Sequence, residues 1–155
     1  MWVDECGLNK DLIRLYGRCP RHQRLYDDDI SGKRISPRIS MIAAYCDGSL
    51  CAPFRFDGYT DSNVFNLWLQ HCLLPELQPG QIIIMDNATF HKSPKTQELI
   101  ASAKCQLLFL PPYSPDLNKI EPQWANLKQG VRSNQDTDLT LHQKLDIQLV
   151  TMAQP

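Results

Sequence analysis

The sequence predicts an α/β domain built on a mixed five-stranded sheet with helices on both faces. A hairpin-type turn joins two β-type segments early in the chain, which predicts antiparallel strands. Short apolar runs then alternate with helical patterns, which predicts strands connected by crossing helices. The length of 155 residues suits a single domain of this kind.

The first three strands are expected before residue 57. Residues 2–3 are the only strand-like residues before the first acidic side chain, so a first strand of only a few residues is expected. Residues 39–45 read as a mostly buried strand, and residues 49–56 can return beside it through the Asp-Gly turn at 47–48. Pro53 weakens the pairing of the returning strand or places it at a sheet edge, because proline cannot donate to a ladder.

A helix and a short strand follow. The apolar residues of segment 64–73 repeat at helical spacing, and Thr60 or Asp61 can cap that helix. Pro75 follows its expected end. Residues 82–85 form a wholly apolar run after a turn, which suits a central strand buried on both faces.

The alternation then repeats once more. Ser93 followed by proline is an N-cap signal for a helix that reaches about Ala103. Residues 107–110 form a second short apolar strand, and three prolines stiffen the loop that follows it. A further helix is expected from about Ile120 to Arg132.

The last part of the chain is expected to be a separate segment. Residues 1–133 make the main domain, and residues 134–155 contain a polar linker followed by an amphipathic helix. Four apolar residues lie along one stripe of that helix: Leu141, Leu145, Leu149 and Met152. Such a stripe is more often a packing face than a surface for a partner, and both interpretations stay open.

Composition and cysteine spacing limit the protein class. Sixteen basic residues against seventeen acidic ones give a net charge of −1, which argues against a self-sufficient nucleic-acid binder. No apolar run approaches a membrane span, and acidic residues within the first five positions argue against a signal peptide. The six cysteines lack zinc-type spacing, so we expect reduced thiols in a cytoplasmic protein that has no membrane partner.

The basic residues are unevenly distributed, with eight of the sixteen in the first 40 positions. A loop facing DNA phosphates is one interpretation. A solvated surface, partly offset by the acidic residues 27–29, is the other. The residues proposed for weak phosphate contacts are Arg18, Arg21, Arg24, Lys33 and Arg34.

Three carboxylates occupy positions that suit metal-ion chemistry. Asp4 lies in or at the end of the first strand, Asp86 ends an apolar strand, and Glu121 opens a helix. Carboxylates gathered at one end of a sheet repel one another unless cations lie between them, and Mg²⁺ prefers such oxygen ligands. Two ions could then activate and stabilise the oxygens of a phosphodiester cleavage. The alternatives are a strand-end aspartate, a turn, and a helix-capping glutamate paired with Asn118.

Three segments resemble a known family. Residues 85–92 (MDNATFHK) resemble the second-aspartate motif of mariner-like transposases of bacterial insertion sequences. Residues 108–121 (LFLPPYSPDLNKIE) resemble the most distinctive block of that family, and residues 4–5 resemble the start of its catalytic domain. Asp86 and Glu121 are separated by 34 residues, as in the family's Asp–34–Glu spacing.

The resemblance, which covers about residues 2–132, implies an RNase H-like fold and a DDE-type catalytic domain. It implies that Asp4, Asp86 and Glu121 bind two Mg²⁺ or Mn²⁺ ions. Similar enzymes cut DNA at transposon ends and join the freed 3′-OH to target DNA, as self-associated complexes on the bacterial nucleoid. Four more residues are implied to support the ligands or contact DNA: Asn87, His91, Asn118 and Lys128. A solvated lysine is the alternative for the last of them.

The sequence departs from the family in two ways. Lys119 replaces a usual proline, which removes stiffness from the loop and adds a charge near Glu121. The helix-turn-helix region that recognises transposon ends in full-length relatives is not found in this sequence. The chain is therefore expected to be either the downstream half of a split reading frame or a remnant that begins at an internal methionine.

Three functions follow from these features. The first is the catalytic core of a transposase. The second is a catalytically silent fragment that acts as a binding or dimerisation module. The third is a related nuclease that acts on DNA junctions or RNA–DNA hybrids.

Overall fold

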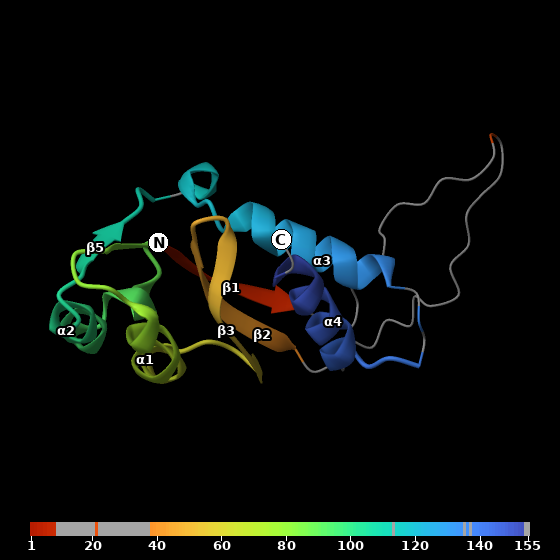
Figure 1. Ribbon diagram of the computed structural model, residues 1–155, viewed down its shortest axis with the longest axis horizontal. Helices are drawn as coiled ribbons and strands as arrows, with labels where there is room; N and C mark the ends of the chain where they lie inside the picture. The colour runs from red at the N-terminus through yellow and green to blue at the C-terminus, as the bar shows by residue number, and fades with distance from the viewer. Residues whose placement is uncertain (9–20, 22–37, 113, 135, 137, 154–155) are drawn as a thin grey trace.

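Five strands form one mixed sheet in the order β3-β2-β1-β4-β5 in the computed structural model, which describes residues 1–8, 21, 38–112, 114–134, 136 and 138–153 (Figure 1). The strands are β1 (Trp2–Leu8), β2 (Ile39–Cys46), β3 (Ser49–Asp57), β4 (Ile82–Met85) and β5 (Gln106–Phe109). The β1–β2 and β2–β3 pairs are antiparallel, whereas β1–β4 and β4–β5 are parallel. The expected mixed five-stranded sheet is confirmed.

Strand β1 is the centre of the sheet and is longer than the sequence indicated. All seven of its residues pair with β2, from Trp2 with Tyr45 to Leu8 with Ile39. The expectation of a strand of only a few residues was wrong, because residues 5–8 also join this ladder. Asp4 therefore lies inside a paired strand.

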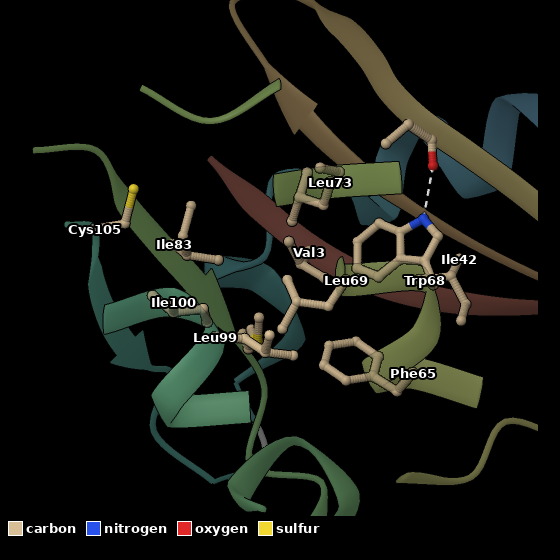
Figure 2. Packing of buried hydrophobic residues seen from close by; sticks show 13 residues of the cluster. Val3, Ile42, Phe65, Trp68, Leu69, Leu73, Ile83, Leu99, Ile100 and Cys105 are labelled. Carbon is tan, nitrogen blue, oxygen red and sulfur yellow. Dashed lines mark hydrogen bonds between the residues drawn. The ribbon is translucent and has the colours of Figure 1, made fainter. Parts of the chain in front are cut away.

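The β2–β3 hairpin forms as expected. Asp47 and Gly48 both have positive φ values, 50° and 90°, which a tight two-residue turn between twisted strands requires. Pro53 lies in β3, at the edge of the sheet. Ala52 also has a positive φ of 48°, at a β-bulge where the register with β2 shifts. The indole of Trp68 donates a 2.8 Å hydrogen bond to the Ala52 carbonyl, so this carbonyl of the distorted segment has a partner (Figure 2).

Four α-helices surround the sheet. They are α1 (Ser62–Trp68), α2 (Pro94–Ser102), α3 (Glu121–Ser133) and α4 (Leu141–Ala153). Asp61 caps α1 and Ser93 caps α2, because each side chain accepts from backbone N–H groups of the first turn. The segment expected to continue α1 instead becomes a π-helical turn (η1, Leu69–Leu73) and a 3₁₀ turn (η2, Leu74–Glu76). Two further 3₁₀ turns are η3 (Thr89–Lys92) and η4 (Pro115–Leu117).

Alternation along the strands creates two cores. Val3 of β1 packs with α1, α2 and η1 on one face, in a cluster that contains Phe65 and Trp68 (Figure 2). Cys6 and Leu8 of the same strand pack with α3 and α4 on the other face. Both faces of the sheet are therefore covered by helices, as expected.

Strand β4 is not buried on both faces, so that expectation was wrong. Ile83 and Met85 are fully buried beneath α1 and α2, whereas Ile82 is 46% exposed. Leu108 of the neighbouring β5 is 52% exposed. The reason is that the core beneath α3 and α4 contains residues of β1 and β2 and none from β4 or β5 among the described residues.

The apolar stripe of α4 is a packing face. Leu141 and Leu145 are buried, and Leu149 and Met152 pack against the same core. Arg55 of β3 also forms an ion pair with Asp146 of α4. Helix α4 is therefore attached to the sheet of its own chain.

In the part of the chain that the structure describes, no helix is long and apolar enough to cross a membrane. The five described cysteines are free thiols, and Cys19 lies outside the described residues. Burial raises the pKa of the Cys6 thiol to about 11.

Replacing Leu145 with alanine should lower the free energy of unfolding by about 2–5 kcal/mol, because a fully buried side chain leaves a cavity between α4 and the sheet. Val150 on the same helix is 62% exposed, so Val150→Ala should change that free energy by less than about 0.5 kcal/mol. Urea unfolding of both variants measures the difference. Equal, small effects would mean that α4 is not packed on the core.

Candidate functional site

Three carboxylates from different parts of the chain line one pocket. Asp4 comes from the middle of β1, Asp86 follows the last residue of β4, and Glu121 is the first residue of α3. The pocket has a volume of about 460 Å³. The three acidic residues singled out in the sequence are thus brought together, although 116 residues separate the first from the last.

Strand pairing explains why the two aspartates are neighbours. Strands β1 and β4 are parallel, with Trp2 paired to Ile84. Asp4 and Asp86 each lie two residues beyond that pair, so they reach the same end of the sheet. Strand β5 lies on the other side of β4. Leu110, the residue after β5, donates its N–H to the Met85 carbonyl at 2.8 Å.

The loop between β5 and α3 brings the glutamate to the pocket. It contains η4 and the prolines of residues 111–115, several of which line the pocket wall. Asn118, near the end of this loop, donates from Nδ2 to the Asp4 Oδ2 atom at 2.9 Å. The Asn118 carbonyl then accepts from the Glu121 N–H at 3.1 Å. One residue therefore joins the loop to the first aspartate and to the start of α3.

Asp4 is an acid in an unfavourable environment for its charge. It is only 8% exposed. Its burial, then the charge of Glu5 and the charges of Glu121 and Asp86, raise its pKa to about 7, despite a hydrogen bond from the Glu5 N–H. The neighbouring carboxylates therefore add repulsion to the cost of burying the Asp4 charge, and a bound cation would relieve this repulsion.

The pKa of Asp86 is shifted in the opposite direction, below its usual value. Its side chain is half exposed, and its Oδ1 atom accepts from His91 Nδ1 at 2.7 Å and from the Ala88 N–H at 2.8 Å. The hydrogen bond from His91 is the main reason why the pKa of Asp86 is lowered. Asp86 is therefore ionised at neutral pH and is held in one orientation.

His91 is fully buried between two carboxylates. Its Nδ1 atom contacts Asp86, and its Nε2 atom lies 2.9 Å from the Glu5 Oε1 atom. Burial lowers the pKa of His91, but the hydrogen bonds and charges of the two carboxylates outweigh it and raise the pKa to about 9. The imidazolium donates from both nitrogens, and its ring packs against Phe65 and Phe90 at centroid distances of 4.5 and 4.4 Å.

The structure distinguishes between the two roles implied for His91, which were support of a metal ligand and contact with DNA. His91 has no exposed surface for a DNA contact, and it supports Asp86 directly. Glu5, which was not singled out as a site residue, supports His91 in turn. A charged residue within an otherwise apolar β1, next to Asp4, was the signal that could have identified it.

The two asparagines have different surroundings. Asn87 lines the pocket, and its Nδ2 atom donates to the Leu110 carbonyl, which joins the ends of β4 and β5. Asn118 is 5% exposed, and its Oδ1 atom has no hydrogen-bond partner among the described residues. This orphaned oxygen is a further potential ligand or acceptor at the pocket.

None of the described basic residues lines the pocket. Lys128 is half-buried, and its charge acts on the Cys6 thiol of β1. Lys119 lies over the Trp2 ring, with its Nζ atom 4.8 Å from the centroid. Arg21 is exposed. The other four residues proposed for phosphate contacts lie outside the described part of the chain: Arg18, Arg24, Lys33 and Arg34.

The donor set fits a hard divalent cation in its chemistry. It offers three carboxylates and one unpaired amide oxygen around one negative pocket, which are the oxygen ligands that Mg²⁺ and Mn²⁺ prefer. Within the described ranges, no three His, Cys, Asp or Glu side chains converge closely enough to hold an ion in their present positions.

Comparison with known proteins identifies the fold. The sequence model of a family described as DDE superfamily endonuclease matches residues 1–140. No curated protein sequence gives a significant match. The structure resembles Mos1 transposase in a paired-end complex with the left transposon end, with a TM-score of 0.71, 14% identity, and coverage of 99% of this chain and 48% of that chain.

Two viral structures are also similar. One is an intasome of simian T-cell lymphotropic virus, with a TM-score of 0.57, 18% identity, and coverage of 75% of this chain and 42% of that chain. The other is the catalytic core domain of BIV integrase, with a TM-score of 0.53, 14% identity, and coverage of 76% and 75%. The fold is therefore that of RNase H-like transposase and integrase cores. The chain spans less than half the length of the intasome and Mos1 chains.

The raised pKa of Asp4 makes metal-free stability depend on pH. Since the folded pKa of about 7 exceeds the usual 3.8, the free energy of unfolding should fall as pH rises from about 4 to 7. Asp4→Asn should remove the contribution of Asp4 to this fall, and it should be roughly 1–3 kcal/mol more stable than the wild type at pH 8 without divalent ions. The fall caused by the raised pKa of His91, which begins at about pH 6.5, should remain in both proteins. Asn118 can rotate its amide so that its free oxygen accepts from the new side chain.

Urea unfolding in a chelator-containing buffer at pH 5 and pH 8 measures this effect. Asp116→Asn is the matched control, because Asp116 is an exposed residue of η4. An Asp4→Asn variant that is no more stable than the wild type at pH 8 would show that the carboxylate is not desolvated.

Proposed function

Because the chain belongs to the DDE superfamily endonuclease family, we propose that it is the catalytic core of a DNA transposase of the mariner-like group of bacterial insertion sequences. The observation that carries this proposal is that Asp4, Asp86 and Glu121 line one pocket together. The motifs around the last two residues support the assignment to this group, through their sequence and their 34-residue separation.

The three carboxylates would hold two Mg²⁺ or Mn²⁺ ions. When bound, such ions activate the attacking oxygen and stabilise the leaving oxygen in phosphodiester cleavage and strand transfer. The residues of the chain contribute orientation and charge. Asp86 is kept ionised by His91, and Asp4 is held by the amide of Asn118. The combined negative charge of the carboxylates attracts cations to the pocket.

DNA would be the partner, as transposon ends and as target. The net charge of −1 favours a division of labour, in which DNA-end recognition is supplied by a helix-turn-helix portion encoded upstream. Arg21 and its basic neighbours in the sequence would contact phosphates. Self-association in a complex with paired DNA ends is part of the proposal, because the Mos1 structure is a paired-end complex.

A catalytically silent fragment is the alternative. It is favoured by the absence, within the described residues, of three side chains already close enough to hold an ion. It is disfavoured as a dimerisation module built on the α4 stripe, because Leu141 and Leu145 are buried in the chain's own core. Metal binding distinguishes the two functions.

Millimolar Mn²⁺ should raise the thermal midpoint of the wild type. An ion that binds only the folded state, at 100 times its dissociation constant, adds about 2.7 kcal/mol of stability. Asp86→Asn should lose most of this shift, because it removes one anionic ligand from the pocket. Differential scanning calorimetry with and without Mn²⁺ measures it, with Asp116→Asn as the control that keeps the shift. A wild type whose midpoint does not change would favour the silent fragment.

Metal-dependent nicking of supercoiled DNA should fall to background in Asp86→Asn and in Glu121→Gln. Each variant replaces one anionic ligand with a neutral amide while keeping the size of the side chain. Gel analysis of nicked product at matched protein concentrations measures the activity. Nicking by a folded Asp86→Asn variant at the wild-type rate would refute the assignment of Asp86.

A further inference from the structure

The two aspartates of the pocket are not aligned by backbone pairing alone. Among the described residues, the ladder between β1 and β4 contains a single registered pair, Trp2 with Ile84. Strand β4 then ends at Met85, one residue before Asp86. The position of Asp86 relative to Asp4 therefore depends on side-chain contacts beyond the end of the ladder.

Glu5 lies where it can supply such a contact. Neighbouring residues of a strand point to opposite faces, and Asp4 pairs with Ala43 while Glu5 pairs with Ile42. Ala43 belongs to the core beneath α3 and α4, whereas Ile42 belongs to the core beneath α1 and α2. Asp4 thus faces the α3 side, and Glu5 faces the side where His91 is buried.

His91 completes a link from β1 to the end of β4. It is 0% exposed, and its two nitrogens lie 2.9 Å from Glu5 Oε1 and 2.7 Å from Asp86 Oδ1. The rings of Phe65 and Phe90 pack against the imidazole, which restricts its rotation. The Glu5 side chain is itself only 15% exposed. Glu5 and His91 are therefore held by packing as well as by hydrogen bonds.

We propose that Glu5 and His91 form a brace that sets the position and orientation of Asp86 relative to Asp4. Glu5 is a positioning residue that acts through His91, on the face of the sheet opposite to Asp4. The consequence for metal binding rests on the proposed function, whereas the geometry of the brace does not. Removing a hydrogen-bonded support of a metal ligand typically weakens metal affinity 10- to 100-fold.

The test compares Glu5→Ala with Glu5→Gln. Both remove the charge of Glu5, which acts on the pocket through space, but glutamine keeps an oxygen that can accept from His91 Nε2. Thr96→Val is the control for general destabilisation. Thr96 is buried in α2, and its hydroxyl bonds to Asn66 and Ser93, so its loss disturbs the same side of the sheet without touching the brace.

The first measurement is Mn²⁺ affinity by isothermal titration calorimetry. Glu5→Ala should bind Mn²⁺ 10- to 100-fold more weakly than the wild type, while Glu5→Gln and Thr96→Val should stay within about threefold. An equal loss in Glu5→Ala and Glu5→Gln would mean that charge alone matters and would overturn the brace. An unchanged affinity in Glu5→Ala would overturn it as well.

The second measurement needs no metal. Three-bond couplings in isotopically labelled, chelator-treated protein report the χ1 rotamer of Asp86. We expect one rotamer in the wild type and in Glu5→Gln, and rotamer averaging in Glu5→Ala. Averaging in a chain that binds no Mn²⁺ would refute the metal-dependent function and support the brace. A single rotamer in Glu5→Ala would refute the brace even if the wild type binds Mn²⁺.

Discussion

The electrostatic cost of gathering carboxylates at one end of the sheet is the constraint on which the site depends. Asp4 is buried in the central strand, and both burial and neighbouring charges disfavour its ionised form. The structure offsets part of this cost with directed donors: Asn118 to Asp4, and His91 to Asp86. What remains is a negative pocket, and a cation is the simplest group that relieves it.

Strand alternation gives this arrangement two sides. Asp4 and Glu5 are adjacent in sequence, yet Asp4 faces the pocket and Glu5 faces the buried imidazole. The stretch of β1 that presents the first aspartate thereby also anchors the second one, through His91. The central strand can organise the site because its two faces are packed by different helices, α1 and α2 on one and α3 and α4 on the other.

Much of the fold could be predicted because its signals are local. The Asp47-Gly48 turn, the Asp61 and Ser93 caps and the start of α3 each depend on a few consecutive residues, and each is found as expected. The errors concern long-range context. The length of β1 depends on its pairing with β2. The exposure of Ile82 depends on which strands of the sheet α3 and α4 cover.

The sequence by itself determined the order of the elements, the family motifs and the three acidic residues, because these are properties of composition and spacing along the chain. Only the tertiary structure decided how those residues meet. It buried His91 between Asp86 and Glu5, joined Asn118 to Asp4, and directed Lys128 towards Cys6. These contacts join residues as far as 122 positions apart, and such distances are set by strand order and helix packing, which no local pattern specifies.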